Sequence, residues 1–170
     1  DIDFVTESSG IKLAETVAEN INPKPKVSVF KTYGTAMIKH QNLDLEFVGA
    51  RKESYTENSR NPEVEIGTLE DDQKRRDFTI NAMAISLGKE NFGELIDPFN
   101  GMQDLSDKIL RTPLEPVQTY SDDPLRMMRA IRFAAQLDFK IESKSLQAIL
   151  DNSERLDIIS IERTMDECNK

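Results

Sequence analysis

The stretch LDLEFVGAR (residues 43–51) alternates apolar and polar side chains, which predicts a β-strand with one buried face. The preceding stretch VSVFKTYGTAMIKH (27–40) alternates in the same way, and a polar turn at 40–42 joins the two. Upstream, residues 11–20 have helical spacing, and the proline-rich NPKPK (22–26) ends that helix. These segments together predict a sheet with a helix on one face.

The middle of the chain is polar and only weakly periodic. Residues 52–72 carry many acids and little alternation, so we expect a mobile loop there. The stretch RRDFTINAMAISL (75–87) has mixed helical spacing and predicts a helix from about Asp77. A short strand is expected in GELIDPF (93–99), followed by a turn at Asn100-Gly101.

Beyond Pro113 the pattern becomes helical. Apolar residues recur every three or four positions in DDPLRMMRAIRFAAQLDF (122–139), SKSLQAILDNSERL (143–156) and SIERTMDECNK (160–170). We expect the buried side of the first of these helices to consist of Leu125, Met128, Ile131 and Leu137. A mixed sheet region followed by helices predicts an α+β protein, with a head at 1–112 and a small helical neck at 113–170.

Composition excludes several classes of protein. Apolar runs are too short to cross a bilayer and the chain opens without a signal-peptide pattern, so we expect a soluble, cytoplasmic protein without membrane partners. The single cysteine, Cys168, allows neither an internal disulfide nor a CxxC zinc site. A net charge of −9 argues against this part of the chain gripping a long phosphate backbone by itself. The oligomeric state does not follow from the sequence.

Acidic residues mark two expected strands. Asp1 and Asp3 stand two apart in the opening DIDFV, so their side chains leave on one face of a strand. Glu46, on the same side of its strand as Asp44, could supply a third carboxylate. Such a set suits Mg²⁺, which prefers hard oxygen ligands. The competing interpretation is that these acids lie on a solvated strand face. For the strand that carries Asp44 and Glu46, taken alone, this interpretation is favoured.

Two further groups combine acids with arginines. A helix from Asp77 would place Asp77 and Asn81 on one face, behind Arg75 and Arg76, within reach of phosphates or a ribose. The alternative is a capping aspartate beside a solvated arginine pair.

Farther along the chain, Asp122 and Asp123 are expected at a helix start, followed at intervals of three by Arg126, Arg129 and Arg132. This arginine row predicts an anionic ligand. The alternative is a surface on which the two aspartates neutralise the arginines.

The segments DIDFV, EDDQKRRDFTINAMAISL, LIDPFNGMQDLSDKILRT, DDPLRMMRAIRFAAQLDF and IERTMDECNK occur in the order found in one enzyme family. Together they resemble the motif series of the bacterial-type (class II) tRNA CCA-adding enzymes and poly(A) polymerases. The resemblance implies a nucleotidyltransferase head of the DNA polymerase beta superfamily followed by a helical neck. It also implies that the head is N-terminally truncated, because the family's glycine-rich segment before the DxD pair is missing, and that body and tail domains which grip tRNA lie outside this chain.

The resemblance implies a role for each matching residue. Two Mg²⁺ ions would be held by Asp1, Asp3 and Glu46. The nucleotide would be contacted by Arg76, by Asp77 and Asn81 near the ribose, by Asp123 and Arg126 through pairing with the base, and by Arg129 and Arg132. Two positions depart from the family pattern: Asp122 stands where glutamate is usual, and Cys168 where leucine is usual.

The activity implied by the resemblance is transfer of CMP and AMP from CTP and ATP to tRNA 3′ ends, which is CCA addition. In this reaction an RNA 3′-hydroxyl attacks the α-phosphate and pyrophosphate leaves. Poly(A) polymerase and A-adding enzyme are alternatives within the family. A non-catalytic nucleotide-binding or RNA-binding module is the alternative from another class.

Overall fold

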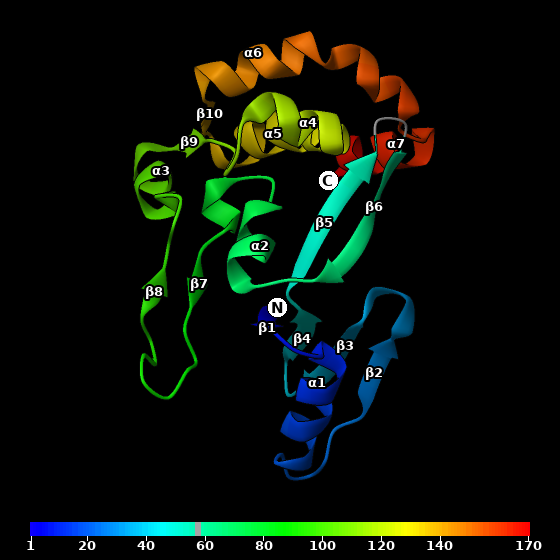
Figure 1. Ribbon diagram of the computed structural model, residues 1–170, viewed down its shortest axis with the longest axis vertical. Helices are drawn as coiled ribbons and strands as arrows, with labels where there is room; N and C mark the ends of the chain where they lie inside the picture. Colours follow the sequence, from blue (N-terminus) through cyan, green and yellow to red (C-terminus); the bar gives the residue numbers. More distant parts are fainter. Residues whose placement is uncertain (57–58) are drawn as a thin grey trace. The chain divides into compact units, whose positions relative to one another are not determined.

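The computed structural model describes residues 1–56 and 59–170, with the side chains of residues 32 and 54–63 left undescribed. The internal contacts divide the chain into two compact units (Figure 1). The first unit comprises residues 1–54 and 63–72, and the second comprises residues 55–62 and 73–170. Each unit has a hydrophobic cluster of its own.

A four-stranded sheet with order β1-β4-β3-β2 forms the centre of the first unit. Its elements are β1 (Ile2–Thr6), α1 (Gly10–Glu19), β2 (Val27–Phe30), η1 (Lys31–Tyr33), β3 (Thr35–His40) and β4 (Leu43–Gly49). Strand β1 pairs with β4 in parallel, whereas β3 pairs antiparallel with both β2 and β4. The connection from β1 through α1 returns the chain to the same sheet, as the predicted sheet with a helix on one face requires.

Helix α1 buries its apolar stripe on that sheet. The cluster consists of two alanines of the helix and inward-facing strand residues: Ala14, Ala18, Ala36, Ile38 and Phe47. Phe4 stacks on Phe47 with ring centroids 4.9 Å apart. The helix begins very close to β4, because a Cβ on Gly10 would lie 2.8 Å from the carbonyl oxygen of Phe47. Small residues on the helix therefore set how closely it approaches the sheet.

Two expectations for this region are wrong. The stretch 27–40 is two strands, because the chain reverses at η1 and at Gly34, whose φ of 64° favours glycine. The expected mobile loop at 52–72 contains the paired strands β5 (Arg51–Thr56) and β6 (Ser59–Ile66) and the start of helix α2 (Leu69–Lys74). A polar sequence can form these strands because strand pairing satisfies the hydrogen bonds of the backbone and does not require an apolar face.

The second unit is mostly helical. Its remaining elements are η2 (Thr79–Asn81), β7 (Ala84–Ile85), β8 (Leu95–Ile96), α3 (Gly101–Asp107), β9 (Ile109–Leu110), α4 (Pro116–Asp122), α5 (Leu125–Leu137), β10 (Lys140–Ile141), α6 (Ser143–Asp151), η3 (Ser153–Ile158) and α7 (Ile161–Asn169). The expected strand in GELIDPF is β8, which pairs with β7. The three helices expected beyond Pro113 correspond to α5, α6 and α7.

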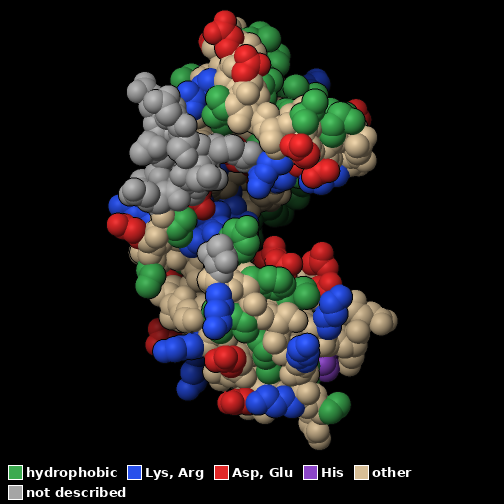
Figure 2. All heavy atoms as spheres, turned by 90° about the vertical axis from the view of Figure 1, so that its right-hand side faces the viewer, with side chains coloured by type: hydrophobic (Ala, Val, Ile, Leu, Met, Phe, Trp, Pro, Cys, Tyr) green, Lys and Arg blue, Asp and Glu red, His purple; other side chains and the backbone are tan. Residues whose placement is uncertain are grey.

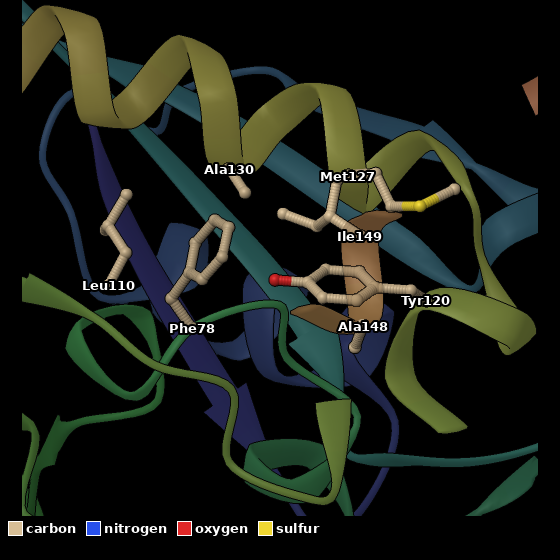
Figure 3. Close-up of a cluster of buried hydrophobic side chains, with 7 residues drawn as sticks. All are labelled: Phe78, Leu110, Tyr120, Met127, Ala130, Ala148 and Ile149. Atoms are coloured by element: carbon tan, nitrogen blue, oxygen red, sulfur yellow. The ribbon is translucent and has the colours of Figure 1, made fainter. Parts of the chain in front are cut away.

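The core of this unit gathers side chains from α4, α5, α6 and the segments before them (Figure 3). Its members are Phe78, Leu110, Tyr120, Met127, Ala130, Ala148 and Ile149. Figure 3 shows Met127 and Ala130 on the side of α5 that faces Tyr120 and Phe78. The Tyr120 hydroxyl meets the Ser145 hydroxyl at 2.5 Å, and burial raises the pKa of Tyr120. This pair supplies the polar partner that a buried phenol needs.

The helix expected from Asp77 is not formed. Phe78 is extended, with φ −132° and ψ 151°, and only the short turn η2 follows. The amide of Thr79 donates to the carbonyl of Arg111 at 2.8 Å, so a partner distant in sequence takes a hydrogen bond that a helix would have used. Burial of Phe78 in the core thus overrides the local helical spacing.

Helix α5 buries only part of the expected stripe: Leu125 is buried as expected, whereas the stripe otherwise differs. Its buried residues are Leu125, Met127 and Ala130, whereas Ile131 and Leu137 are 57% and 42% exposed. Asp122 and Asp123 also do not open this helix: Asp122 is the last residue of α4, and Asp123 lies between the two helices. Pro116 opens α4 inside the proline-marked stretch, where its fixed φ suits a first helical turn.

The mixed helix and strand content confirms the predicted α+β class. The compact units divide near residue 72, because residues 73–111 pack with the helices that follow them. The head and neck boundary near residue 112 stays a prediction. None of the helices in the described residues is long and apolar enough to cross a membrane.

Candidate functional site

Two acids lie side by side on the first unit's sheet. Asp3 of β1 is the register partner of Glu46 of β4, and Phe4 is the partner of Phe47. The phenylalanines pack with α1, so alternation along the strands directs Asp3 and Glu46 to the opposite face. Both acids are exposed, and Asp1, also exposed, directly precedes the strand. The sheet thus brings together two of the three predicted carboxylates.

This pair fits a divalent cation in its chemistry. The carboxylates are hard oxygen donors on neighbouring strands, which run about 4.8 Å apart, so both side chains can reach one ion by rotation. Among the residues that the structure describes, no group of three or more His, Cys, Asp or Glu side chains already stands as a metal site. The three-carboxylate set therefore stays a prediction.

Asp77 accepts hydrogen bonds from several residues of the second unit. It is 8% exposed, and its Oδ1 accepts hydrogen bonds from the amide of Phe78 (2.9 Å) and from Nδ2 of Asn81 (3.0 Å). Its Oδ2 accepts from Nε of Arg129 at 2.7 Å. Asp77 and Asn81 thus meet as the spacing of four predicted, although η2 rather than an α-helix brings them together.

The three arginines of α5 have acceptors outside their own helix. Arg126 donates through Nη2 to the carbonyl oxygen of Arg75 at 2.6 Å, and Arg129 donates to Asp77. Arg132 donates through Nε to Glu167 of α7 at 2.7 Å. The expected row is present, and these acceptors lie in other segments of the second unit, namely the stretch before η2 and helix α7. Acceptors remote in sequence therefore help to orient the guanidinium groups.

Phe133 lies between two members of the row. The guanidinium carbon of Arg129 is 5.1 Å from its ring centroid, and that of Arg132 is 4.3 Å away. Glu167, 5% exposed, also accepts from Nζ of Lys170 at 2.9 Å. Burial would raise the pKa of Glu167, but the Lys170 hydrogen bond and the charges of Arg132 and Lys170 together lower it. Arg132 is thereby held by a carboxylate that stays ionised.

The residues expected to read the base, Asp123 and Arg126, lie just before α5 and in its first turn. Oδ1 of Asp123 accepts from the amide of Leu125 at 3.2 Å, and its carbonyl accepts from the amide of Arg126 at 3.0 Å. Burial raises the pKa of the neighbouring Asp122, against the opposing effects of the Gln118 hydrogen bond and the charges of Arg126 and Arg155. Hydrogen bonds therefore hold the backbone between Asp123 and Arg126, which are three residues apart.

The sequence pattern assigned no role to Asp104 or Glu167, which the structure buries. Asp104, 5% exposed, accepts from the hydroxyl of Thr79 at 2.7 Å and from Nε of Arg111 at 3.2 Å. Glu167 was missed as the partner of Arg132. No periodicity marks Asp104, and the only pointer to Glu167 was its place in the segment IERTMDECNK. Elsewhere, acidic and basic side chains are interspersed over the visible surface of each unit (Figure 2).

Family models match most of the chain. Residues 1–111 match the poly A polymerase head domain, and residues 138–170 match the probable RNA and SrmB-binding site of polymerase A. The first match contains the paired acids and the Arg75–Asp77 segment. The second contains the α7 residues that hold Arg132.

Curated relatives align over nearly all of the chain. An A-adding tRNA nucleotidyltransferase from Aquifex aeolicus is 44% identical over 163 residues, covering 94% of this chain and 19% of its own length. A CCA-adding enzyme from Lactobacillus helveticus is 37% identical over 169 residues, covering 98% of this chain and 40% of its own length. The chain therefore spans less than half the length of these relatives.

Solved structures agree with these relatives. A tRNA nucleotidyltransferase complexed with a primer tRNA and an incoming ATP analog superposes with a TM-score of 0.84 at 39% identity, over 98% of this chain and 46% of that one. A tRNA-processing enzyme with CTP gives 0.83 at 37% identity, over 99% of this chain and 43% of that one. The paired acids, the arginine row and these matches together lead to one conclusion: the chain belongs to the poly(A) polymerase head-domain family of nucleotidyltransferases, which includes the tRNA CCA-adding enzymes.

Proposed function

We propose that the protein adds CMP and AMP to tRNA 3′ ends from CTP and ATP, the CCA-adding reaction. The observation that carries the proposal is the register pairing of Asp3 with Glu46 on the open face of the sheet, within the part of the chain that matches the head domain. It is supported by relatives that align over 94% and 98% of the chain and are named as an A-adding tRNA nucleotidyltransferase and a CCA-adding enzyme.

Asp1, Asp3 and Glu46 would hold two Mg²⁺ ions. Bound magnesium supplies Lewis-acid stabilisation of phosphate charge and lowers the pKa of a coordinated hydroxyl. The contribution of the chain is the placement of the carboxylates, since neighbouring strands fix the spacing of Asp3 and Glu46. The free rotation of these exposed side chains lets them adapt to the ion and to the triphosphate.

The arginine row would hold and read the nucleotide. Arg76, Arg129 and Arg132 would meet phosphate or sugar oxygens, for which guanidinium groups are well suited. Asp123 would accept from the exocyclic amine of cytosine or adenine while Arg126 donates to a ring acceptor, an arrangement that fits both bases and disfavours uracil and guanine. Asn81, which is exposed, would contact the ribose. The same contact was expected of Asp77 from the sequence.

A-adding activity is the second candidate, because one relative at 44% identity is an A-adding enzyme. Both activities use the same head, so the residues of the site do not separate them. Poly(A) synthesis is a third outcome within the family. These alternatives differ in the product formed and in the RNA end that is accepted.

The deciding experiment incubates the full-length protein with Mg²⁺ and tRNA transcripts ending before the CCA or after its two cytidines. CTP, ATP or both are supplied, and products are sized on a sequencing gel. Three nucleotides added to the first transcript support CCA addition. A single adenosine added only to the second supports A addition, and a long ladder with ATP supports poly(A) synthesis. A lack of extension under every condition contradicts the proposal and favours a non-catalytic binding module.

A further inference from the structure

Asp77 and Arg129 form a contact that joins the arginine row to the segment before η2. The pair spans 52 positions of sequence, with Nε of Arg129 2.7 Å from Oδ2 of Asp77. The side chain of Asp77 is 9% exposed, whereas that of Arg129 is 31% exposed. The carboxylate is therefore turned inward, and the guanidinium keeps an accessible part.

Several contacts fix the carboxylate itself. The amide of Phe78 and the side chain of Asn81 both donate to Oδ1, which leaves Oδ2 directed at Arg129. Phe78 is fully buried in the core, so the amide that holds Asp77 moves little. A buried carboxylate saturated in this way serves as a fixed acceptor.

The contacts to Arg129 determine its plane. A guanidinium is planar, so an acceptor on Nε fixes the directions of both Nη groups. The ring of Phe133, 5.1 Å from the guanidinium carbon, restricts the same group from its face. The Nη groups are then presented to a ligand with little orientational entropy left to lose.

From these contacts we propose that Asp77 is a positioning residue that orients Arg129 toward the nucleotide, in place of the ribose contact expected from the sequence. The inference rests on the proposed function for its ligand, ATP or CTP. The pairing of Asp77 with Arg129 stands on the geometry of the second unit alone.

A double-mutant cycle in the full-length protein tests the proposal. Asp77→Asn should lower kcat/KM for ATP about tenfold, the effect of losing one charge-assisted hydrogen bond. In an Arg129→Ala background, Asp77→Asn should have almost no further effect on kcat/KM, because the guanidinium through which Asp77 acts is absent. Full additivity would overturn the proposal.

Asp104→Asn is the matched control for the cycle. It removes another buried acid that accepts from an arginine, Arg111, without touching Arg129. Its effect should add to that of Arg129→Ala, so coupling would be specific to Asp77. Equal coupling for both acids would contradict a specific positioning role.

Discrimination between ATP and 2′-deoxy-ATP separates positioning from sugar contact. A positioning role predicts that Asp77→Asn weakens the use of both nucleotides equally, so that their ratio changes less than about twofold. A larger fall in the preference for ATP would identify Asp77 as a ribose ligand and overturn the proposal, because a site that hydrogen-bonds a substrate hydroxyl rejects the analogue without it by far more than about twofold.

A spectroscopic measurement tests the pair independently of activity. In the protein labelled with ¹⁵N-arginine, the Nε–H resonance of Arg129, assigned by its loss in Arg129→Lys, should shift and exchange faster in Asp77→Asn. An unchanged resonance would overturn the proposal. If Asp77→Asn does not fold, Asp77→Glu keeps the charge and should displace the same resonance. A wild-type protein that adds nucleotides to no RNA would refute the proposed function while leaving this measurement decisive.

Discussion

At the residue scale, the same residue types serve opposite purposes in the two units. Asp3 and Glu46 are exposed on an open sheet face, where carboxylates cost little and remain available to a ligand. Asp77 and Asp104 are buried, and each accepts from an arginine and from at least one further donor. Burial without such partners would be costly, so Asp77 and Asp104 are held by hydrogen bonds, whereas exposed carboxylates can remain hydrated.

Replacing Asp3 with alanine should abolish nucleotide addition without unfolding the full-length protein. The side chain is exposed, so little packing is lost, whereas loss of a metal ligand should lower the rate at least about a hundredfold. Primer extension and thermal unfolding measure the two effects. Glu19→Ala removes an exposed acid from α1 and should preserve activity. Near-normal addition by Asp3→Ala would rule out the metal assignment.

Replacing Arg126 with alanine should relax the choice among nucleotides. A base contact of this kind contributes about 1–3 kcal/mol to discrimination, so UTP and GTP should be incorporated at least about fivefold more readily relative to CTP and ATP. Competition assays with all four nucleotides measure the ratio. Arg163→Ala, on the exposed side of α7, removes the same charge as a control. Unchanged selectivity would refute the base-reading role.

At the element scale, helix α5 is positioned by its core packing and by its arginines. Met127 and Ala130 are buried in the core, Arg129 donates to Asp77 just before η2, and Arg132 donates to Glu167 of α7. The row therefore depends on elements that are far apart along the chain. Helix α7 contributes through Glu167, which joins Arg132 and Lys170.

The ion pair between Glu167 of α7 and Arg132 of α5 should weaken in acid. The pKa of Glu167 is lower in the folded protein than its ordinary value of 4.5, so its ionised form stabilises the fold above that pH. The stabilisation is lost as the pH falls below 4.5 through the folded-state value. Urea unfolding at several pH values should show wild type more stable than Glu167→Gln at pH 7, with the difference vanishing in acid. Glu162→Gln, exposed on the same helix, should show no such trend; a constant difference for Glu167→Gln would contradict the prediction.

At the scale of the whole molecule, the predicted chemistry is divided between two compact units. The acids proposed for metal binding belong to the first, and the arginine row belongs to the second. A net charge of −9 over 170 residues fits metal and nucleotide sites of local extent better than a long RNA-binding surface. Nucleotide addition should therefore require both units together with Mg²⁺.

Removal of magnesium should stop nucleotide addition reversibly. Excess EDTA should abolish extension by the full-length protein, and added Mg²⁺ should restore it. Glu46→Gln should raise the Mg²⁺ concentration needed for half-maximal rate about tenfold, since it removes a charged ligand. Asp44→Asn, on the same strand and face, is the matched control. An equal shift in both variants would point to the general field of the strand and not to coordination by Glu46.

Local sequence patterns were enough to predict the α+β class, the helix on the sheet, the helical second half and the candidate residues. These predictions follow from local periodicity and from motifs that are each contained in one short segment of the sequence. The pairing of Asp3 with Glu46, the extended backbone at Phe78 and the acceptors of the three arginines were decided by tertiary structure. Strand register and burial depend on residues tens of positions away, so a local pattern could name Arg129 and Asp77 but could not show that they bind each other.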